Sequence, residues 1–191
     1  MKSRVLFQRF LTNPATIGSL YPSSSELCRE MLAGTNIESA QNVIELGPGT
    51  GVITMEILTL ISHQTKFFAV ELDNHIYKEF KKHWPHVKIY NDSAENLGNI
   101  MEKDGMENAD VIVSGLPWAA FPEQLQQSIL QEVLASLPEN GCFTTFAYLQ
   151  GMMLPAARRF KKMLKSNFAE VETSKVIWKN IPPAFVYRCR K

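Results

Sequence analysis

Cysteine is scarce in this chain, and long apolar runs are missing. The three cysteines, Cys28, Cys142 and Cys189, are far apart and form no Cys-x-x-Cys pair, which argues against a disulfide framework and indicates buried free thiols in a reducing compartment. No stretch approaches the about 20 apolar residues of a membrane-spanning helix, and Arg9 interrupts the basic segment 1–11 too early for a signal peptide. We therefore expect a cytoplasmic protein, and no motif predicts a metal site.

A strong net charge is absent as well. The 20 lysines and arginines are balanced by 19 aspartates and glutamates, which gives a net charge of +1 at pH 7. The molecule as a whole is therefore not drawn to nucleic acid or membrane by its charge, and such binding must depend on local clusters. The length of 191 residues, with 45% hydrophobic residues, is ordinary for one globular domain with a substantial core.

Short β-rich runs alternate with longer helical patterns from residue 42 onward. This alternation predicts a parallel sheet covered by helices on both faces. The final segments 170–180 and 184–191 predict two strands that pair antiparallel, because the tight Pro-containing connection leaves no room for a crossover helix. The other strands are expected at 42–47, 66–72, 87–91, 109–116 and 141–149, and helices at 50–62, 74–84, 123–137 and 154–167.

The first predicted strand ends in a glycine-rich loop, with the sequence VIELGPGTG over residues 43–51. Gly47, Gly49 and Gly51 permit a tight turn and a close approach of the backbone to a ligand, and the following helix offers unpaired N–H groups at its N-terminus. The spacing is G-x-G-x-G rather than the G-x-G-x-x-G of dinucleotide-binding proteins. A lone glycine loop is weak evidence, so its meaning depends on the neighbouring strand ends.

Acidic residues stand at the ends of the next two predicted strands. Glu71 lies 20 residues after Gly51, at a place where an acidic side chain accepts hydrogen bonds from ribose hydroxyls. Asp92 follows the third strand and is suited to accept a hydrogen bond from the exocyclic amine of adenine. Each residue alone is also explained as an exposed strand end, but together with the glycine loop they predict a bound adenosine group.

With these motifs, residues 40–191 resemble the class I S-adenosylmethionine-dependent methyltransferases. The resemblance implies a Rossmann-like α/β fold, in which a seven-stranded, mostly parallel sheet ends in an antiparallel hairpin. It implies S-adenosylmethionine as the cofactor, with the glycine loop at its methionine part, Glu71 at the ribose and Asp92 beside the adenine. The cofactor-binding residues that it implies are Glu45, Gly47, Pro48, Gly49, Thr50, Gly51, Glu71, Leu72, Asp92, Ser93, Ala94 and Ser114.

The fourth predicted strand ends in the sequence SGLPW, residues 114–118. Amino-methylating members of this class carry an Asn- or Asp-Pro-Pro-aromatic or Asn-Leu-Pro-aromatic motif here, which holds the target nitrogen. Gly115 stands where adenine-N6 enzymes carry Asn, so it offers only its backbone to the edge of a flipped base. This departure from the motif counts against a nucleic-acid base as the substrate.

Methyl transfer from a sulfonium is a direct displacement, so the enzyme must mainly align the reactants and exclude water. The attacking amine must arrive unprotonated, which desolvation favours. Backbone carbonyls of Gly115 or Leu116 and the hydroxyl of Tyr21 are candidate proton acceptors, and Trp118 is suited to a cation–π contact or to core packing. The residues with a predicted catalytic role are Tyr21, Gly115, Leu116, Pro117 and Trp118.

The segment FLTNPATIGSLYPSS, residues 10–24, resembles one branch of this class, the bacterial phospholipid N-methyltransferases. The Gly-Leu-Pro at 115–117 and NIPPAFVY at 180–187 strengthen this resemblance, which covers nearly the whole chain. It implies successive methylation of phosphatidylethanolamine towards phosphatidylcholine, at the inner face of the membrane, with residues 13–24 as a lid. An ornithine-type aminolipid fits the same pocket argument.

The first 12 residues have a basic amphipathic pattern, in which apolar residues share one helical face. Such a helix rests in an anionic membrane interface or docks on its own domain. We therefore divide the chain into an amphipathic helix with a lid, 1–40, and a methyltransferase domain, 41–191. The predicted contacts to substrate or membrane are Leu6, Phe7, Phe10, Tyr148, Arg158 and Tyr187. Tyr148 and Tyr187 are explained equally well as half-buried aromatics, whereas the basic run 158–165, with Arg158, is explained slightly better as a solvated face.

Two rival interpretations remain open. The motifs VIELGPGTG, AVELD and SGLPW are also similar to those of ribosomal RNA adenine dimethyltransferases, although Gly115, the near-zero charge and the missing C-terminal helical domain argue against RNA. The third interpretation is a cofactor-binding protein without catalysis. The expected partners are an aminophospholipid substrate and an anionic lipid surface, with RNA only under the second interpretation and no DNA.

Overall fold

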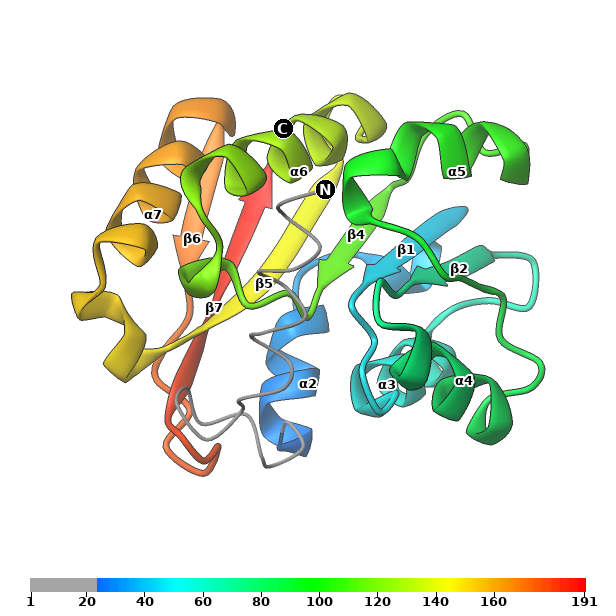
Figure 1. The fold of residues 1–191 in the computed structure, drawn as a ribbon, viewed down its shortest axis with the longest axis horizontal. Helices are drawn as coiled ribbons and strands as arrows, with labels where there is room; N and C mark the ends of the chain where they lie inside the picture. Colours follow the sequence, from blue (N-terminus) through cyan, green and yellow to red (C-terminus); the bar gives the residue numbers. More distant parts are fainter. Residues whose placement is uncertain (1–23) are drawn as a thin grey trace.

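A computed structural model describes residues 24–191 of the chain. These residues form one seven-stranded sheet with the strand order β3-β2-β1-β4-β5-β7-β6, covered by helices on both faces (Figure 1). The predicted amphipathic helix over residues 1–12 and most of the predicted lid lie outside the described residues. No helix within residues 24–191 has the length and apolar character needed to cross a bilayer.

Five parallel strands make up most of the sheet, and their carboxyl ends lie at one edge. β7 (Ala184–Arg190) runs antiparallel to both of its neighbours, which confirms the predicted mostly parallel sheet with an antiparallel C-terminal hairpin. The remaining strands are β1 (Asn42–Leu46), β2 (Lys66–Val70), β3 (Ile89–Tyr90), β4 (Val111–Ser114), β5 (Cys142–Tyr148) and β6 (Glu170–Thr173).

The connection between β6 and β7 is longer than the sequence predicts. β6 was expected to continue to residue 180, but it ends at Thr173. The Ser174 hydroxyl accepts a hydrogen bond from the Val186 N–H at 2.9 Å and so replaces a main-chain bond of the ladder. Beyond it, only an isolated bridge from Ile177 to Ala184 continues the pairing, so residues 174–183 form an extended connection.

Within residues 24–191, three helices cover each face of the sheet (Figure 1). One face carries α2 (Ser25–Leu32), α3 (Val52–Leu60) and α4 (Asn74–His83); the other carries α5 (Leu97–Asp104), α6 (Glu123–Ser136) and α7 (Pro155–Asn167). Short 3-10 helices lie in the connections between these helices and the strands: η2 (Ile37–Ser39), η3 (Ala94–Asn96), η4 (Trp118–Ala120) and η5 (Leu149–Met153).

The helix α5 was not predicted from the sequence. Its segment LGNIMEKD contains Gly98 and Asn99, which are weak helix formers. The helix is stabilised by the burial of Leu97, Ile100 and Met101 in the core shared with α6. The local sequence does not indicate this packing.

The central strand β1 is buried on both faces. Ile44 and Leu46 pack in the core under α5, α6 and α7, while Val43 packs in a second core with α2 and α3. α2 contributes Leu27 and Met31 to that second core, so residues 25–32 pack directly on the sheet. The predicted boundary at residue 40 stays a prediction. All three cysteines are buried and unpaired, as predicted.

Candidate active site

The glycine loop after β1 adopts a conformation that only glycine adopts easily. Gly49 has a φ of 57° and Gly51 a φ of 86°, both in the left-handed region. A Cβ at Gly51 would lie 2.2 Å from Nε1 of Trp84, which covers this end of the loop. A Cβ at Gly49 would meet nothing within 4 Å, so the backbone there borders open space.

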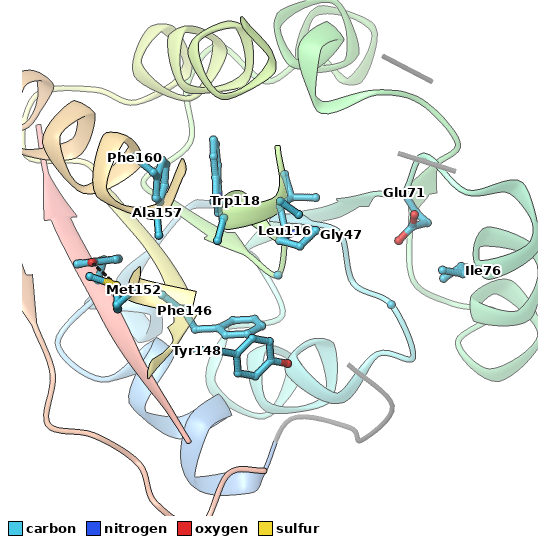
Figure 2. Close-up of a pocket in the computed structure, with 17 residues that line it drawn as sticks. Gly47, Glu71, Ile76, Leu116, Trp118, Phe146, Tyr148, Met152, Ala157 and Phe160 are labelled. Carbon is cyan, nitrogen blue, oxygen red and sulfur yellow. Dashed lines mark hydrogen bonds between the residues drawn. The ribbon is translucent and has the colours of Figure 1, made fainter. Parts of the chain in front are cut away.

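That space is a pocket of about 240 Å³ at the carboxyl edge of the sheet. It runs from the glycine loop and Glu71 to the aromatic side chains of β5 and α7 (Figure 2). Most of its wall is apolar, which favours the burial of uncharged groups. The residues that line the pocket include Gly49, Glu71, Leu116, Trp118, Tyr148 and Phe160.

Glu71 is the carboxylate in this pocket wall, and it is only 4% exposed. Its Oε1 accepts a hydrogen bond from the Asp73 N–H at 2.9 Å. Burial raises the pKa of Glu71 to about 7, although hydrogen bonds from the backbone of Asp73 and Gly49 oppose the shift. A carboxylate in this position, next to the glycine loop, is suited to accept hydrogen bonds from the hydroxyls of a bound ribose.

Glu45 lies on the face of β1 that packs against α3, beneath the glycine loop. It is fully buried, and its Oε2 accepts a hydrogen bond from Thr54 Oγ1 at 2.6 Å. Burial raises the pKa of Glu45 to about 8, although the Thr54 hydroxyl opposes the shift. Within residues 24–191 its Oε1 has no hydrogen-bond partner, so one polar atom of this carboxyl is left unpaired behind the loop.

The turn after β4 is held by side-chain hydrogen bonds. The Ser114 hydroxyl accepts from the Leu116 N–H at 3.3 Å and from Trp118 Nε1 at 3.1 Å. A Cβ at Gly115 would lie only 2.5 Å from the carbonyl oxygen of Gly47. The two loops are therefore in backbone contact, and residue 115 has no room for a side chain.

Trp118 is both a core residue and part of the pocket wall. It is 2% exposed and stacks on Phe160 with ring centroids 4.3 Å apart and an angle of 13° between the rings. The ring packs in the core and also lines the pocket, and its cation–π contact stays a prediction.

Gln126, on α6, links the turn after β4 to α7 by hydrogen bonds. This residue was not predicted from the sequence. It is fully buried, and its Nε2 donates to the carbonyls of Trp118 at 2.6 Å and Ala156 at 3.2 Å. Its Oε1 accepts from Arg159 Nε at 3.3 Å. The only signal in the sequence was a polar residue on the face of α6 that also carries the buried Ile129 and Leu130.

Replacing Gln126 by leucine is expected to lower the free energy of unfolding by about 1–3 kcal/mol, because the buried carbonyl of Trp118 and the partly buried carbonyl of Ala156 lose this donor. Urea denaturation measures the change. The matched control is Gln127→Leu, because the side chain of Gln127 is exposed and donates a hydrogen bond to Glu123. This substitution should change the free energy of unfolding by less than about 0.5 kcal/mol. Equal effects of the two substitutions would contradict this role of Gln126.

The remaining predicted residues fall into three groups. Tyr148 and Tyr187 line the pocket, as do Gly47, Pro117 and Leu116. Asp92 accepts through Oδ1 from the Ser93 N–H and from Asn96 Nδ2, both at 2.7 Å. Those outside the pocket wall are Glu45, Pro48, Thr50, Gly51, Leu72, Asp92, Ser93, Ala94, Ser114 and Arg158, and those outside the described residues are Leu6, Phe7, Phe10 and Tyr21.

The residues present fit the adenosyl cofactor that this fold implies. The open face of Gly49 leaves space for a ligand against the loop backbone, and Glu71 supplies a hydrogen-bond acceptor beside it. The sheet order, the glycine loop after β1 and the acidic residue after β2 together define a class I S-adenosylmethionine-dependent methyltransferase.

Within this class, the chain belongs to the ribosomal RNA adenine dimethylase family, whose model matches residues 8–170. Over its full length it is 31% identical to the ornithine lipid N-methyltransferase of Singulisphaera acidiphila, of which 97% is covered. The ribosomal RNA small subunit methyltransferase A of Chlorobium phaeobacteroides is 26% identical over 73 residues, which are 38% of this chain and 27% of that protein.

Solved methyltransferase structures share the fold. An O-methyltransferase from Bacillus cereus superposes with a TM-score of 0.71 at 14% identity, over 97% of this chain and 90% of that one. The N-methyltransferase NodS from Bradyrhizobium japonicum gives a TM-score of 0.69 at 14% identity, over 97% and 98% of the two chains. At these identities the likeness concerns the fold alone.

Proposed function

We propose that the protein transfers methyl groups from S-adenosylmethionine to the amine of an aminolipid headgroup. The observation that carries the proposal is the contact between Gly115 and the Gly47 carbonyl, where a Cβ would lie at 2.5 Å. A polar side chain at residue 115, which would hold an adenine amine, has no space in this arrangement. The full-length similarity to a lipid N-methyltransferase supports the same substrate class.

The cofactor supplies an electrophilic methyl group on a sulfonium. In the proposed site, the backbone of residues 47–51 holds the methionine part and Glu71 the ribose. Asp92 and its neighbours Ser93 and Ala94 flank the adenine next to Leu72, while Glu45 and Ser114 support the two loops from behind.

The protein's own contribution is to orient the amine and to keep it uncharged. The apolar wall around Trp118 and Phe160 excludes water, which favours the neutral, nucleophilic form of an amine. The carbonyls of Gly115 or Leu116 accept its N–H groups, and the Tyr21 hydroxyl is a further candidate. Ser114 and Gln126 hold the Trp118 wall in place, which fixes the approach of the nucleophile.

The proposal includes two headgroups. Phosphatidylethanolamine is favoured by the motifs at residues 10–24 and 180–187, and ornithine lipid by the relative from Singulisphaera acidiphila. Both present a primary amine on a short carbon chain. An RNA adenine is the second candidate, since the family model is named for ribosomal RNA adenine dimethylases.

Labelled methyl from S-adenosylmethionine is expected to enter lipid rather than RNA. The protein is incubated in separate reactions with vesicles containing phosphatidylethanolamine, with vesicles containing ornithine lipid, and with total bacterial RNA. Label in one lipid, in bands that track mono-, di- and trimethylated headgroups, supports aminolipid methylation and identifies the headgroup. Label in RNA alone contradicts the proposal and assigns the protein to the activity for which its family is named.

A further inference from the structure

Most of the exposed large apolar side chains in the described part of the chain come from two segments. Among residues 24–191, seven large hydrophobic side chains are exposed, and five of them come from the segments 149–154 and 178–181. Met153 is 79% exposed, Trp178 69% and Ile181 66%. We call the five residues the apolar rim; they are Leu149, Met153, Leu154, Trp178 and Ile181. Exposed apolar patches of this kind mark interaction surfaces.

The two segments emerge from the same end of two neighbouring strands. β5 and β7 pair antiparallel up to Tyr148 opposite Ala184, and the Leu149 N–H then donates to the Pro183 carbonyl at 2.9 Å. η5 continues from β5, and the β6–β7 connection leads into β7 (Figure 1). Two segments that are 24 or more residues apart in the sequence are therefore joined at one edge of the fold.

The apolar rim borders the pocket. Tyr148 precedes Leu149 directly, Met152 precedes Met153, and both Tyr148 and Met152 line the pocket wall (Figure 2). The Tyr187 hydroxyl donates to Met152 Sδ at 3.6 Å, which fixes η5 to β7. The rim residues of η5 therefore lie directly beside residues of the pocket wall.

Basic side chains accompany the apolar ones. The Arg158 N–H donates to the Leu154 carbonyl at 3.2 Å, so Arg158 lies one helical turn from the rim, and its side chain is exposed. Lys179 follows Trp178 and remains 79% exposed although it pairs with Glu26 at 2.6 Å. α7 carries five basic residues and no acidic one, in the sequence PAARRFKKMLKSN. Apolar groups that include a tryptophan, next to basic groups, match the interface of an anionic bilayer.

We propose that the apolar rim inserts into the headgroup region of an anionic bilayer and presents the pocket to its lipid substrate. This inference rests on the proposed function, because only a membrane-embedded substrate requires the pocket to face a bilayer. It assigns a membrane contact to residues 149–154 and 178–181, in addition to the amphipathic helix predicted at residues 1–12.

Flotation of the full-length protein with vesicles of phosphatidylethanolamine and phosphatidylglycerol tests the proposal. The double substitution Met153→Asp with Trp178→Asp is expected to weaken vesicle binding about ten-fold or more, because two charges replace apolar groups that enter the interface. The matched control is Met55→Asp, which changes an exposed methionine on α3, outside both rim segments. The control should float like the unmodified protein.

Tryptophan fluorescence provides a second readout. The unmodified protein should show a blue shift with vesicles that Trp178→Phe abolishes, since Trp118 is buried and the half-buried Trp84 lies at the glycine loop, outside the rim. Circular dichroism checks that each variant is folded. Equal flotation of the double variant and the control overturns the proposal. So does a loss of flotation that follows only deletion of residues 1–12, or a double variant that loses RNA retention instead of vesicle binding.

Turnover separates this inference from the proposed function. With a short-chain aminolipid below its micelle concentration, the double variant should methylate as fast as the unmodified protein, while its turnover on vesicles falls with its binding. If no lipid is methylated by any variant, the proposed function fails. Flotation and fluorescence still decide the membrane contact, because neither depends on turnover.

Discussion

Replacing Gly115 by alanine is expected to reduce methyl transfer about 100-fold or more, because a displacement of about 1 Å at reacting groups has effects of this size. The new Cβ would lie 2.5 Å from the Gly47 carbonyl oxygen and must push the two loops apart. The turn after β4 and the glycine loop would move together, which disturbs both sides of the pocket. The maximal rate and the cofactor dissociation constant of the purified variant measure this change.

The control for Gly115 is Gly151→Ala. A Cβ at Gly151 meets only the Cβ of Ala119, at 3.9 Å, which is an ordinary contact. This variant should keep its activity within about two-fold, and thermal unfolding should place its stability near that of the unmodified protein. A Gly115→Ala enzyme that also stays within two-fold would mean that the backbone contact does not position the reactants. Gly115→Asn is expected to be at least as inactive, on lipid and on RNA.

Replacing Glu71 by glutamine is expected to weaken cofactor binding about 10- to 100-fold, as expected when a charged hydrogen-bond acceptor in a buried site is lost. The amide oxygen can still accept from the Asp73 N–H. Its NH₂ group, however, cannot accept from a ribose hydroxyl or from the backbone of Gly49. Calorimetric titration with S-adenosylhomocysteine measures the dissociation constant without turnover.

The pH dependence of cofactor binding gives this prediction a second test. Burial raises the pKa of Glu71 to about 7, so the free protein carries the proton at pH 6 and loses it by pH 8. Ribose hydroxyls donate hydrogen bonds to the ionised carboxylate and so favour it, and the affinity should therefore rise from pH 6 to pH 8 and level off above.

In Glu71→Gln that rise should disappear. The matched control is Glu107→Gln, an exposed residue that precedes β4, which should keep both the affinity and its pH profile. An affinity of the unmodified protein that does not vary between pH 6 and pH 8 would place the cofactor away from Glu71.

The glycine loop and the acidic residue after β2 were predictable from the sequence alone. Both depend on short-range features, since a buried strand is recognised by its apolar run and its end by the glycines and the acid that follow. Because parallel strands share one carboxyl edge, the order of the motifs along the chain already predicts that Gly49 and Glu71 meet in one site. The antiparallel position of β7 was equally predictable from the missing crossover segment.

Only the tertiary structure decided what lies between distant segments. The exclusion of a side chain at Gly115 depends on the carbonyl of Gly47 on another loop, and the role of Gln126 depends on carbonyls of η4 and α7. The two segments of the apolar rim meet because β5 and β7 are neighbours in the sheet and a main-chain hydrogen bond joins Leu149 to Pro183. Such contacts depend on the order of the strands in the sheet, and a local pattern of residue types does not determine that order.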